Sequence, residues 1–425
     1  MKPGYKQTEV GVIPEDWGSE RLADLVDPNR TIRYGIVQPG KFDQSGRYMI
    51  RGQDYSKGWV HPSEFFKVSA AVETPFQNAR VKKGDVLMTI VGASTGRIAI
   101  VPEWLDGANL TQTTARIAPR SQHVSGHFLS SVLASPFGQR QVANYIKGNA
   151  QPGLNCGDIE KFIVPLPPLA EQEAIATALS DADAHIDSLE QLIVKKRLLK
   201  QGAMQDLLTG NQRLPGFEGD WEVKTFGEIF TYLPTATNSR SDLGEEGDAF
   251  YIHYGDIHTK FHNHLDFRTT RPPKIARSRC RNAALLKNGD WVMADASEDY
   301  DGVGKTIEIQ GLDDDTDAIA GLHTFVLREK TPTFAPGFKG HLGNLKSLHE
   351  QYLRVATGMK VYGVSKAALR DLELPVPTLP EQTAIAAILS DMNAEIAALE
   401  AKLAKARQVK QGMMQELLTG KTRLV

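Results

Sequence analysis

Three short motifs carry residue types that could do chemistry, and each lacks a part that the chemistry needs. Gly304-Lys305-Thr306 resembles the end of a phosphate-binding loop, but the glycine that such a loop requires five residues earlier is Asp299. Glu222-Val223-Lys224 matches half of a nuclease motif, and a three-residue match is common by chance. The Asn-Pro-Pro-aromatic stretch of amino-methyltransferases does not occur. The sequence therefore predicts a chain without a catalytic site.

Four histidines, His253, His258, His262 and His264, crowd twelve residues. Their spacings of five, four and two positions suit neither one face of a helix nor a known zinc pattern. We expect polar side chains at strand ends and in a loop, and no metal site in this chain.

Bulk charge gives only a weak indication of partners. The chain of 425 residues has a formal net charge of −2, whereas a non-specific polyanion binder would be strongly basic. Residues 21–160 nevertheless carry 16 Lys and Arg against 11 Asp and Glu, and residues 268–287 hold seven basic residues and no acid. Such a run is either a solvated loop or a surface that contacts a polyanion.

Cysteine usage and hydropathy indicate the compartment. The two cysteines, Cys156 and Cys280, cannot form a disulfide framework, so we expect a reducing cytoplasm. No apolar leader follows the first residues, and no apolar run approaches the ~18 residues that a membrane span needs. We expect two to four globular domains that have no membrane partner.

An internal repeat determines the predicted architecture. Residues 165–214 align with residues 375–424 at a constant offset of 210 positions, without a gap and with 28 identities. Each copy opens with prolines and Glu-Gln and ends in Leu-Leu-Thr-Gly, as expected of a helix that begins after proline and stops at glycine. In the second copy, apolar residues alternate at intervals of four and three from Ile385 to Leu403, which predicts a coiled-coil seam.

The charge pattern predicts how the two helices pair. The first half of each helix is acidic, for example at Asp183, Glu190 and Glu400, and the second half is basic, for example at Arg197 and Lys410. Acid faces base along both edges only if the helices are antiparallel. Each exposed pair contributes less than ~1 kcal/mol, so the charges set orientation more than stability. The alternative, two unrelated amphipathic helices on separate cores, fits a gapless repeat poorly.

Next to the repeats lie two diverged units, about 18–160 and 222–370, that look like distant copies of each other. A turn leading into a strand occurs in both, and short β-rich runs between Gly, Asp and Asn predict strand-rich domains with a few helices. The N-terminal segment resembles the tail that the C-terminal repeat lacks. The sequence therefore predicts a pseudo-circular, pseudo-two-fold arrangement.

The doubled pattern resembles the conserved regions of the specificity subunits of type I restriction-modification systems. The resemblance rests on Pro-x-Pro-x-Leu-x-Glu-Gln-x-Ala-Ile-Ala, then Leu-Ser-Asp and Leu-Leu-Thr-Gly, in both copies, and it covers the whole chain. It implies an α+β fold in which two strand-rich target recognition domains are separated by two long antiparallel coiled-coil helices. The expected domains are 1–164 and 215–374, with cores at about 18–160 and 222–370, and the expected spacer helices are 165–214 and 375–425.

The resemblance also implies function and partners. Each recognition domain would read one half of a bipartite sequence in double-stranded DNA, and the helices would set the gap between half-sites. The chain would bind no cofactor itself. Two modification subunits would bind S-adenosylmethionine and methylate adenine, and two motor-nuclease subunits that use ATP and magnesium could join them. The alternative is a non-catalytic coiled-coil scaffold or adaptor with two ligand-binding modules.

DNA-binding candidates come from residue type and position, because recognition domains vary widely and no base contact can be carried over. Arg and Gln can read guanine and adenine bidentately, whereas most basic residues contact phosphate or are solvated surface. We expect Arg51→Ala or Arg277→Ala to weaken DNA binding while assembly stays intact. The candidates of the first unit are Arg33, Gln38, Lys41, Arg51, Gln53, Lys57, Ser94, Thr95 and Arg97; those of the second are Arg240, His253, His258, Lys260, Arg271, Lys274, Arg277, Arg279 and Lys305.

A second group of candidates lies at the helix ends and would dock the modification subunits. The alternative for them is packing inside the coiled coil or onto the recognition domains. They are Glu171, Gln172, Met204, Leu207, Leu208, Glu381, Gln382, Met414, Leu417 and Leu418.

Overall fold

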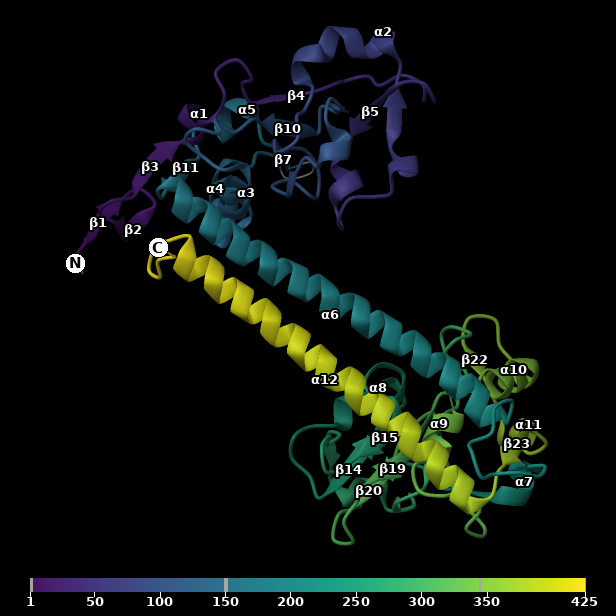
Figure 1. Cartoon of the computed structure of the whole chain (residues 1–425). Helices are drawn as coiled ribbons and strands as arrows, with labels where there is room; N and C mark the ends of the chain where they lie inside the picture. Colours follow the sequence, from purple (N-terminus) through teal and green to yellow (C-terminus); the bar gives the residue numbers. More distant parts are fainter. Residues whose placement is uncertain (1–2, 149–151, 344, 425) are drawn as a thin grey trace. The chain divides into compact units, whose positions relative to one another are not determined.

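The computed structural model describes residues 3–148, 152–343 and 345–424, and it divides the chain into two compact units. The first unit comprises residues 1–190 together with 401–425, and the second comprises residues 191–400. Each unit holds a domain of mixed strands and helices and one half of each of two long helices, α6 (Leu169–Thr209) and α12 (Leu379–Leu417) (Figure 1). The expected mixture of helices and strands is therefore confirmed. Among the described residues, no helix is long and apolar enough to cross a membrane.

The domain of the first unit is built on two small sheets. One has the order β4-β10-β7-β8 with antiparallel neighbours, and the other has the order β6-β5-β9, in which β5 and β9 are parallel. Strand β7 is buried along its whole length because it lies inside its sheet. The elements are β1 (Tyr5–Thr8), β2 (Gly11–Pro14), β3 (Gly18–Arg21), α1 (Leu22–Leu25), β4 (Arg33–Tyr34), β5 (Arg47–Ile50), β6 (Phe66–Val68), α2 (Ala70–Glu73), β7 (Val86–Thr89), β8 (Ile98–Ile100), β9 (Asn109–Leu110), β10 (Thr114–Ile117), α3 (Gly126–Ala134), α4 (Pro136–Tyr145), α5 (Cys156–Ile159) and β11 (Ile163–Leu166).

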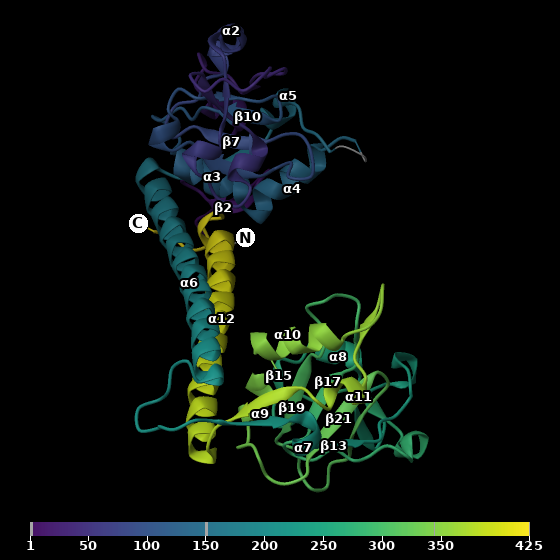
Figure 2. The same cartoon turned by 90° about the vertical axis from the view of Figure 1, so that its right-hand side faces the viewer.

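The domain of the second unit has a five-stranded sheet of order β13-β21-β17-β19-β15 and a three-stranded sheet of order β16-β14-β20 (Figure 2). In the second sheet β14 and β20 are parallel. The elements are β12 (Glu222–Thr225), α7 (Phe226–Ile229), β13 (Phe230–Leu233), β14 (Ala249–Ile252), α8 (Tyr254–Thr259), β15 (Asn263–Asp266), β16 (Lys274–Ile275), β17 (Trp291–Ala294), β18 (Ala296–Ser297), β19 (Thr306–Gln310), β20 (Ala318–Ala320), β21 (Thr324–Glu329), α9 (Phe338–Leu342), α10 (Lys346–Val355), β22 (Tyr362–Gly363), α11 (Lys366–Leu369) and β23 (Glu373–Val376).

The two domains share most of their strand order, and β15 is an additional edge strand of the second. The run β10-β7-β8 of the first unit matches β21-β17-β19 of the second, and β6-β5-β9 matches β16-β14-β20 with the same parallel and antiparallel neighbours. A two-stranded ribbon precedes the long helix in both, β3 with β11 and β12 with β23. The expectation that the units are diverged copies is therefore confirmed.

Within each unit the long helices lie side by side and run in opposite directions (Figure 1). In the first unit Lys410 pairs with Asp183, and Arg407 Nη2 lies 2.6 Å from Glu190 Oε1. In the second unit Arg197 Nη2 lies 2.5 Å from Glu400 Oε1. The antiparallel charge pairing expected from the sequence is thus confirmed inside each unit.

The ends of the helices belong to the domain cores. Ile175 of α6 and the residues Leu417 and Leu418 pack into the apolar core of the first unit. Leu207 and Leu208 of α6 pack with Ile385 of α12 into the apolar core of the second unit. Burial of such a side chain stabilises by ~1.5–3 kcal/mol, so helices and domain are held together mainly by apolar contact.

Candidate nucleic-acid interface

Arg51 lies in the turn that directly follows β5, and its guanidinium is already paired within the domain. The Asp54 side chain is buried, and Arg51 Nη2 and Nε donate to Asp54 Oδ1 at 2.7 and 3.0 Å. Arg51 keeps only 28% of its side chain exposed. The neighbouring candidates Gln53 and Lys57 are exposed. Arg51 therefore holds the turn in shape, while its neighbours offer free polar groups.

The segment of Gln38 and Lys41 begins next to the same turn. The Ile36 amide donates to the Leu110 carbonyl at 2.6 Å, and the Thr111 amide donates to the Ile50 carbonyl at 3.1 Å, which brings this segment to the end of β5. Gln38 and Lys41 are exposed, and Arg33 is half-buried in β4.

The loop of Ser94, Thr95 and Arg97 connects β7 to β8. Thr95 Oγ1 donates to the Gly92 carbonyl at 2.7 Å, so this side chain shapes the loop. Ser94 is half-buried. Arg97 is exposed, and within the part of the chain that the structure describes it forms no ion pair. Arg97 is the cation of this loop that is available to a ligand.

In the second unit, the corresponding turn is built around the buried Asp256. Arg240 Nη2 and Lys260 Nζ each lie 2.9 Å from Asp256 Oδ1, so two candidates meet on one carboxylate. Burial acts to raise the pKa of Asp256, but the hydrogen bonds from Arg240 and Lys260 outweigh it and hold the pKa below its usual value. His253 caps α8 by accepting the Gly255 amide at 3.1 Å on Nδ1, and burial lowers its pKa.

His258 and Lys305 lie together at an open cleft of about 770 Å³. Lys305 Nζ donates to the His258 carbonyl at 2.6 Å, and His258 Nε2 lies 2.9 Å from the Ala296 carbonyl. Burial lowers the pKa of Lys305. Five of the second unit's candidates are thus gathered around α8.

The other four candidates of the second unit divide into two kinds. Arg271 and Lys274 lie over the ring of Phe250, at 5.7 and 5.4 Å from its centroid, and keep their charges free of carboxylates among the described residues. Arg277 donates through Nη2 to the Ala283 carbonyl at 3.1 Å and also to the Cys280 carbonyl, so it fixes its own loop. Arg279 lies 2.5 Å from a carboxylate, that of Asp242.

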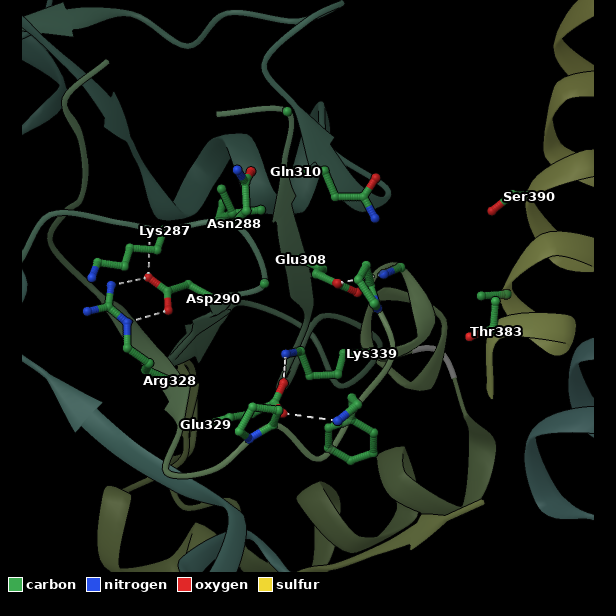
Figure 3. Close-up of a pocket in the computed structure, with 18 of the residues that line it drawn as sticks. Lys287, Asn288, Asp290, Glu308, Gln310, Arg328, Glu329, Lys339, Thr383 and Ser390 are labelled. Atoms are coloured by element: carbon green, nitrogen blue, oxygen red, sulfur yellow. Dashed lines mark hydrogen bonds and ion pairs between the residues drawn. The ribbon is translucent and has the colours of Figure 1, made fainter. Parts of the chain in front are cut away.

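Another cleft of about 770 Å³ lies between the five-stranded sheet and α12, and most of its charges are neutralised within the protein (Figure 3). Arg328 Nη2 lies 2.6 Å from Asp290 Oδ2, and Lys339 pairs with Glu329. Glu308 accepts backbone amides at 2.7 and 2.8 Å. This cleft contains none of the DNA-binding candidates. In the described chain, no group of three or more His, Cys, Asp and Glu could hold a metal ion.

Glu171, a docking candidate, is instead the centre of a clamp inside the first unit. Its buried carboxylate accepts Trp17 Nε1 at 3.0 Å and Arg423 Nε and Nη2 at 2.6 and 2.8 Å. Arg423 also reaches Asp16 at 2.8 Å. We call this trio the Glu–Trp–Arg clamp.

The second unit has the same clamp. Glu381 accepts Trp221 Nε1 at 3.0 Å and Arg213 Nε and Nη2 at 2.6 and 2.8 Å. Sequence reasoning missed the tryptophans and arginines of both clamps. Two signals could have found them: Arg213 and Arg423 differ by the repeat offset of 210, and a tryptophan directly precedes the expected core of each recognition domain.

The remaining docking candidates also have partners within the chain. Gln172 accepts the Ser125 amide at 2.9 Å, and Gln382 accepts the Ala335 amide at 2.7 Å. Their contacts favour the internal-packing alternative, and the docking role stays a prediction. Buried in the cores are Leu207, Leu208, Leu417 and Leu418, with Met204 and Met414 packed against them.

Comparison with protein families and curated proteins gives one consistent result. A family model described as type I restriction modification DNA specificity domain matches residues 14–195. The chain is 35% identical over 182 residues to the type I restriction enzyme EcoBI specificity subunit of Escherichia coli, an alignment that covers 43% of this chain and 38% of that protein. It is 26% identical to the putative type I restriction enzyme MjaX specificity subunit of Methanocaldococcus jannaschii, over 99% of this chain and 97% of that protein.

Solved structures agree on the fold. An S subunit of a type I restriction-modification system from M. genitalium matches with a TM-score of 0.56 and 15% identity, over 98% of this chain and 99% of that one. The HsdS subunit from Thermoanaerobacter tengcongensis matches with a TM-score of 0.50 and 18% identity, over 96% and 98%. Residues 14–195 therefore match the type I restriction modification DNA specificity domain, and the chain as a whole is similar in sequence to specificity subunits of type I restriction enzymes and in fold to S subunits.

Proposed function

We propose that this chain is the non-catalytic subunit that reads the DNA target of a type I restriction-modification complex, with one half-site for each recognition domain. One observation carries the proposal: two domains that share most of their strand order are each joined to a helix pair by the same Glu–Trp–Arg clamp. Two recognition domains that are attached to the helices in the same way suit a DNA target that has two separate parts.

The division of labour follows the repeat. Residues 1–164 and 215–374 are the recognition domains, and residues 165–214 and 375–425 are the spacer segments, whose helices α6 and α12 set the gap between half-sites. One helical turn advances ~5.4 Å, and one base pair of DNA advances ~3.4 Å, so a turn gained or lost in the spacer corresponds to one or two base pairs.

A pseudo-circular order of the elements is part of the proposal. Its support lies inside the first unit, where Tyr5 Oη donates to the Gly420 carbonyl at 3.0 Å and Arg423 binds Asp16. The segment after α12 thereby occupies, in the first unit, the place that the segment after α6 occupies in the second.

The complex supplies the chemistry that this chain lacks. We assign the chain two modification subunits, which bind S-adenosylmethionine and methylate adenine, and two motor-nuclease subunits that use ATP and magnesium. The modification subunits are needed for DNA to be methylated, and the motor-nuclease subunits are needed only for cleavage.

The test is the adenine-methylation map of a methylation-free host that expresses this chain with its modification subunit. We expect a split motif with a fixed gap, absent when this chain is omitted. Replacing the loop residues of one recognition domain should change one half of the motif only. A purified, assembled complex that methylates no such motif would contradict the proposal, and absence of salt-dependent DNA affinity would favour the scaffold alternative.

A further inference from the structure

A short loop of the second unit presents apolar side chains to solvent. Residues 357–363, which we call the finger, are closed by two hydrogen bonds between Thr357 and Gly363, with N···O distances of 2.9 and 2.8 Å. At the tip, Met359 is 94% exposed and Val361 is 53% exposed. Gly358 has φ +129°, and a Cβ atom there would lie 1.9 Å from the Val361 carbonyl oxygen, so the tight turn requires glycine.

The base of the finger is braced by a neighbouring loop, residues 295–305. Tyr362 stacks on Tyr300 with ring centroids 4.1 Å apart, and β22 pairs with β18 through Tyr362 and Ser297. Tyr300 is itself 56% exposed. Single exposed apolar residues are normal on any surface, but this pair of loops exposes three together on a stiff support.

The bracing loop links the finger to the DNA-binding candidates around α8. His258 bonds the Ala296 carbonyl at one end of this loop, and Lys305 stands at the other end. Lys360 adds a positive charge at the tip itself, and it is exposed.

Carboxylates on the bracing loop restrict how DNA can approach. Asp299 is engaged within the loop, where it accepts the Gly302 amide at 2.8 Å. Glu298 and Asp301 are exposed on either side of Tyr300 and would repel phosphates there. The part of the loop pair suited to DNA is therefore the finger tip, where Met359 and Val361 flank Lys360.

We propose that Met359 is a wedge that enters between two base pairs of the half-site read by the second unit, while Lys360 contacts the adjacent phosphate. The inference rests on the proposed function and adds a mode of reading to it. Apolar side chains inserted at a base step unstack it and kink the duplex. Because flexible pyrimidine–purine steps unstack most easily, the finger selects sequence at a step where it forms no hydrogen bond.

The test uses the chain assembled with its modification subunits and duplexes carrying the mapped motif, with 2-aminopurine placed step by step along each half-site. In the wild-type complex, the modification subunits should raise fluorescence at the target adenines, because methyltransferases flip their target base out of the stack. We expect one further rise, at one base step of the half-site read by the second unit. Met359→Ala should abolish this rise and weaken binding of the motif about tenfold, because it removes the apolar atoms that the unstacked bases would cover. Met359→Leu should keep both.

Val223→Ala is the matched control, because Val223 is another exposed apolar residue of the same unit, at 62% exposure. It should change neither fluorescence nor affinity. Unchanged fluorescence and affinity in Met359→Ala would overturn the wedge while leaving the proposed function intact. Impaired assembly with normal DNA binding by the assembled fraction would also overturn it, and would make the finger a protein contact. A wild-type complex without preference for any motif would instead contradict the proposed function itself.

Discussion

At the scale of single residues, the basic candidates separate into those that hold the domain and those that are free to bind. Arg51 donates to the Asp54 carboxylate and Arg277 donates to backbone carbonyls. Arg97 and Lys57, in contrast, are exposed. A loss of DNA affinity in an Arg51 variant would therefore combine two effects. The free cations test DNA contact more directly.

Arg97→Ala should weaken DNA binding of the assembled complex several-fold and leave the unfolding midpoint unchanged, because it removes a phosphate contact and no internal bond. Arg51→Ala should lower the free energy of unfolding by about 2 kcal/mol, because it leaves the buried Asp54 carboxylate without its arginine. Titrations at fixed salt and urea melts measure the two effects. Lys83→Ala, at an exposed pair with Glu103, is the control that should change neither. Equal stability of Arg51→Ala and wild type would show that Asp54 needs no partner.

At the scale of elements, the sequence predicted the two long helices and their antiparallel direction, because a gapless repeat preserves apolar spacing and charge order. The helices are shorter than the expected 165–214 and 375–425, because β11 and β23 take the first residues of each segment and the helices end at Thr209 and Leu417. It did not predict the strand order, because strands of two to six residues carry little pattern and β5 pairs with β9 across about sixty residues. It also could not show that Arg51 pairs with Asp54, because a basic residue after a strand can bind a ligand or stabilise its own turn equally well.

The clamps and the exposed helix pairs differ greatly in burial, and their contributions should differ accordingly. Glu381→Gln should lower the free energy of unfolding by about 3 kcal/mol, because Arg213 and Trp221 lose a buried carboxylate. Glu400→Gln, on the same helix, should cost less than ~1 kcal/mol, because its pair with Arg197 is 45% and 61% exposed.

Urea melts of the two variants give the comparison, and pull-down of the modification subunit separates stability from docking. If Glu381→Gln unfolded like the wild type but no longer bound the modification subunit, the docking role would be correct and the internal one wrong.

At the scale of the whole molecule, the proposed circular order predicts that the chain tolerates new termini. A variant opened between Gly216 and Gly219, in an exposed turn, and joined from its old C-terminus to its old N-terminus by a short flexible linker keeps both clamps. It should direct methylation to the same split motif as the wild type. The methylation map is the measurement, and a folded, assembled permutant with a changed gap would contradict the circular order.

The first unit is built from two stretches of chain that lie far apart in the sequence, and this has a consequence for synthesis on the ribosome. Its core includes Leu417 and Leu418, and its clamp includes Arg423, whereas the second unit is one unbroken stretch. The core of the domain translated first can therefore be completed only after more than two hundred further residues have been added. This takes some 10–40 s at typical elongation rates of ~5–20 residues per second. Throughout that interval Ile175 and Leu179 lack the last leucines that cover them. The nascent chain completes its second domain before its first, and premature release near residue 400 would leave the earlier domain with an open core.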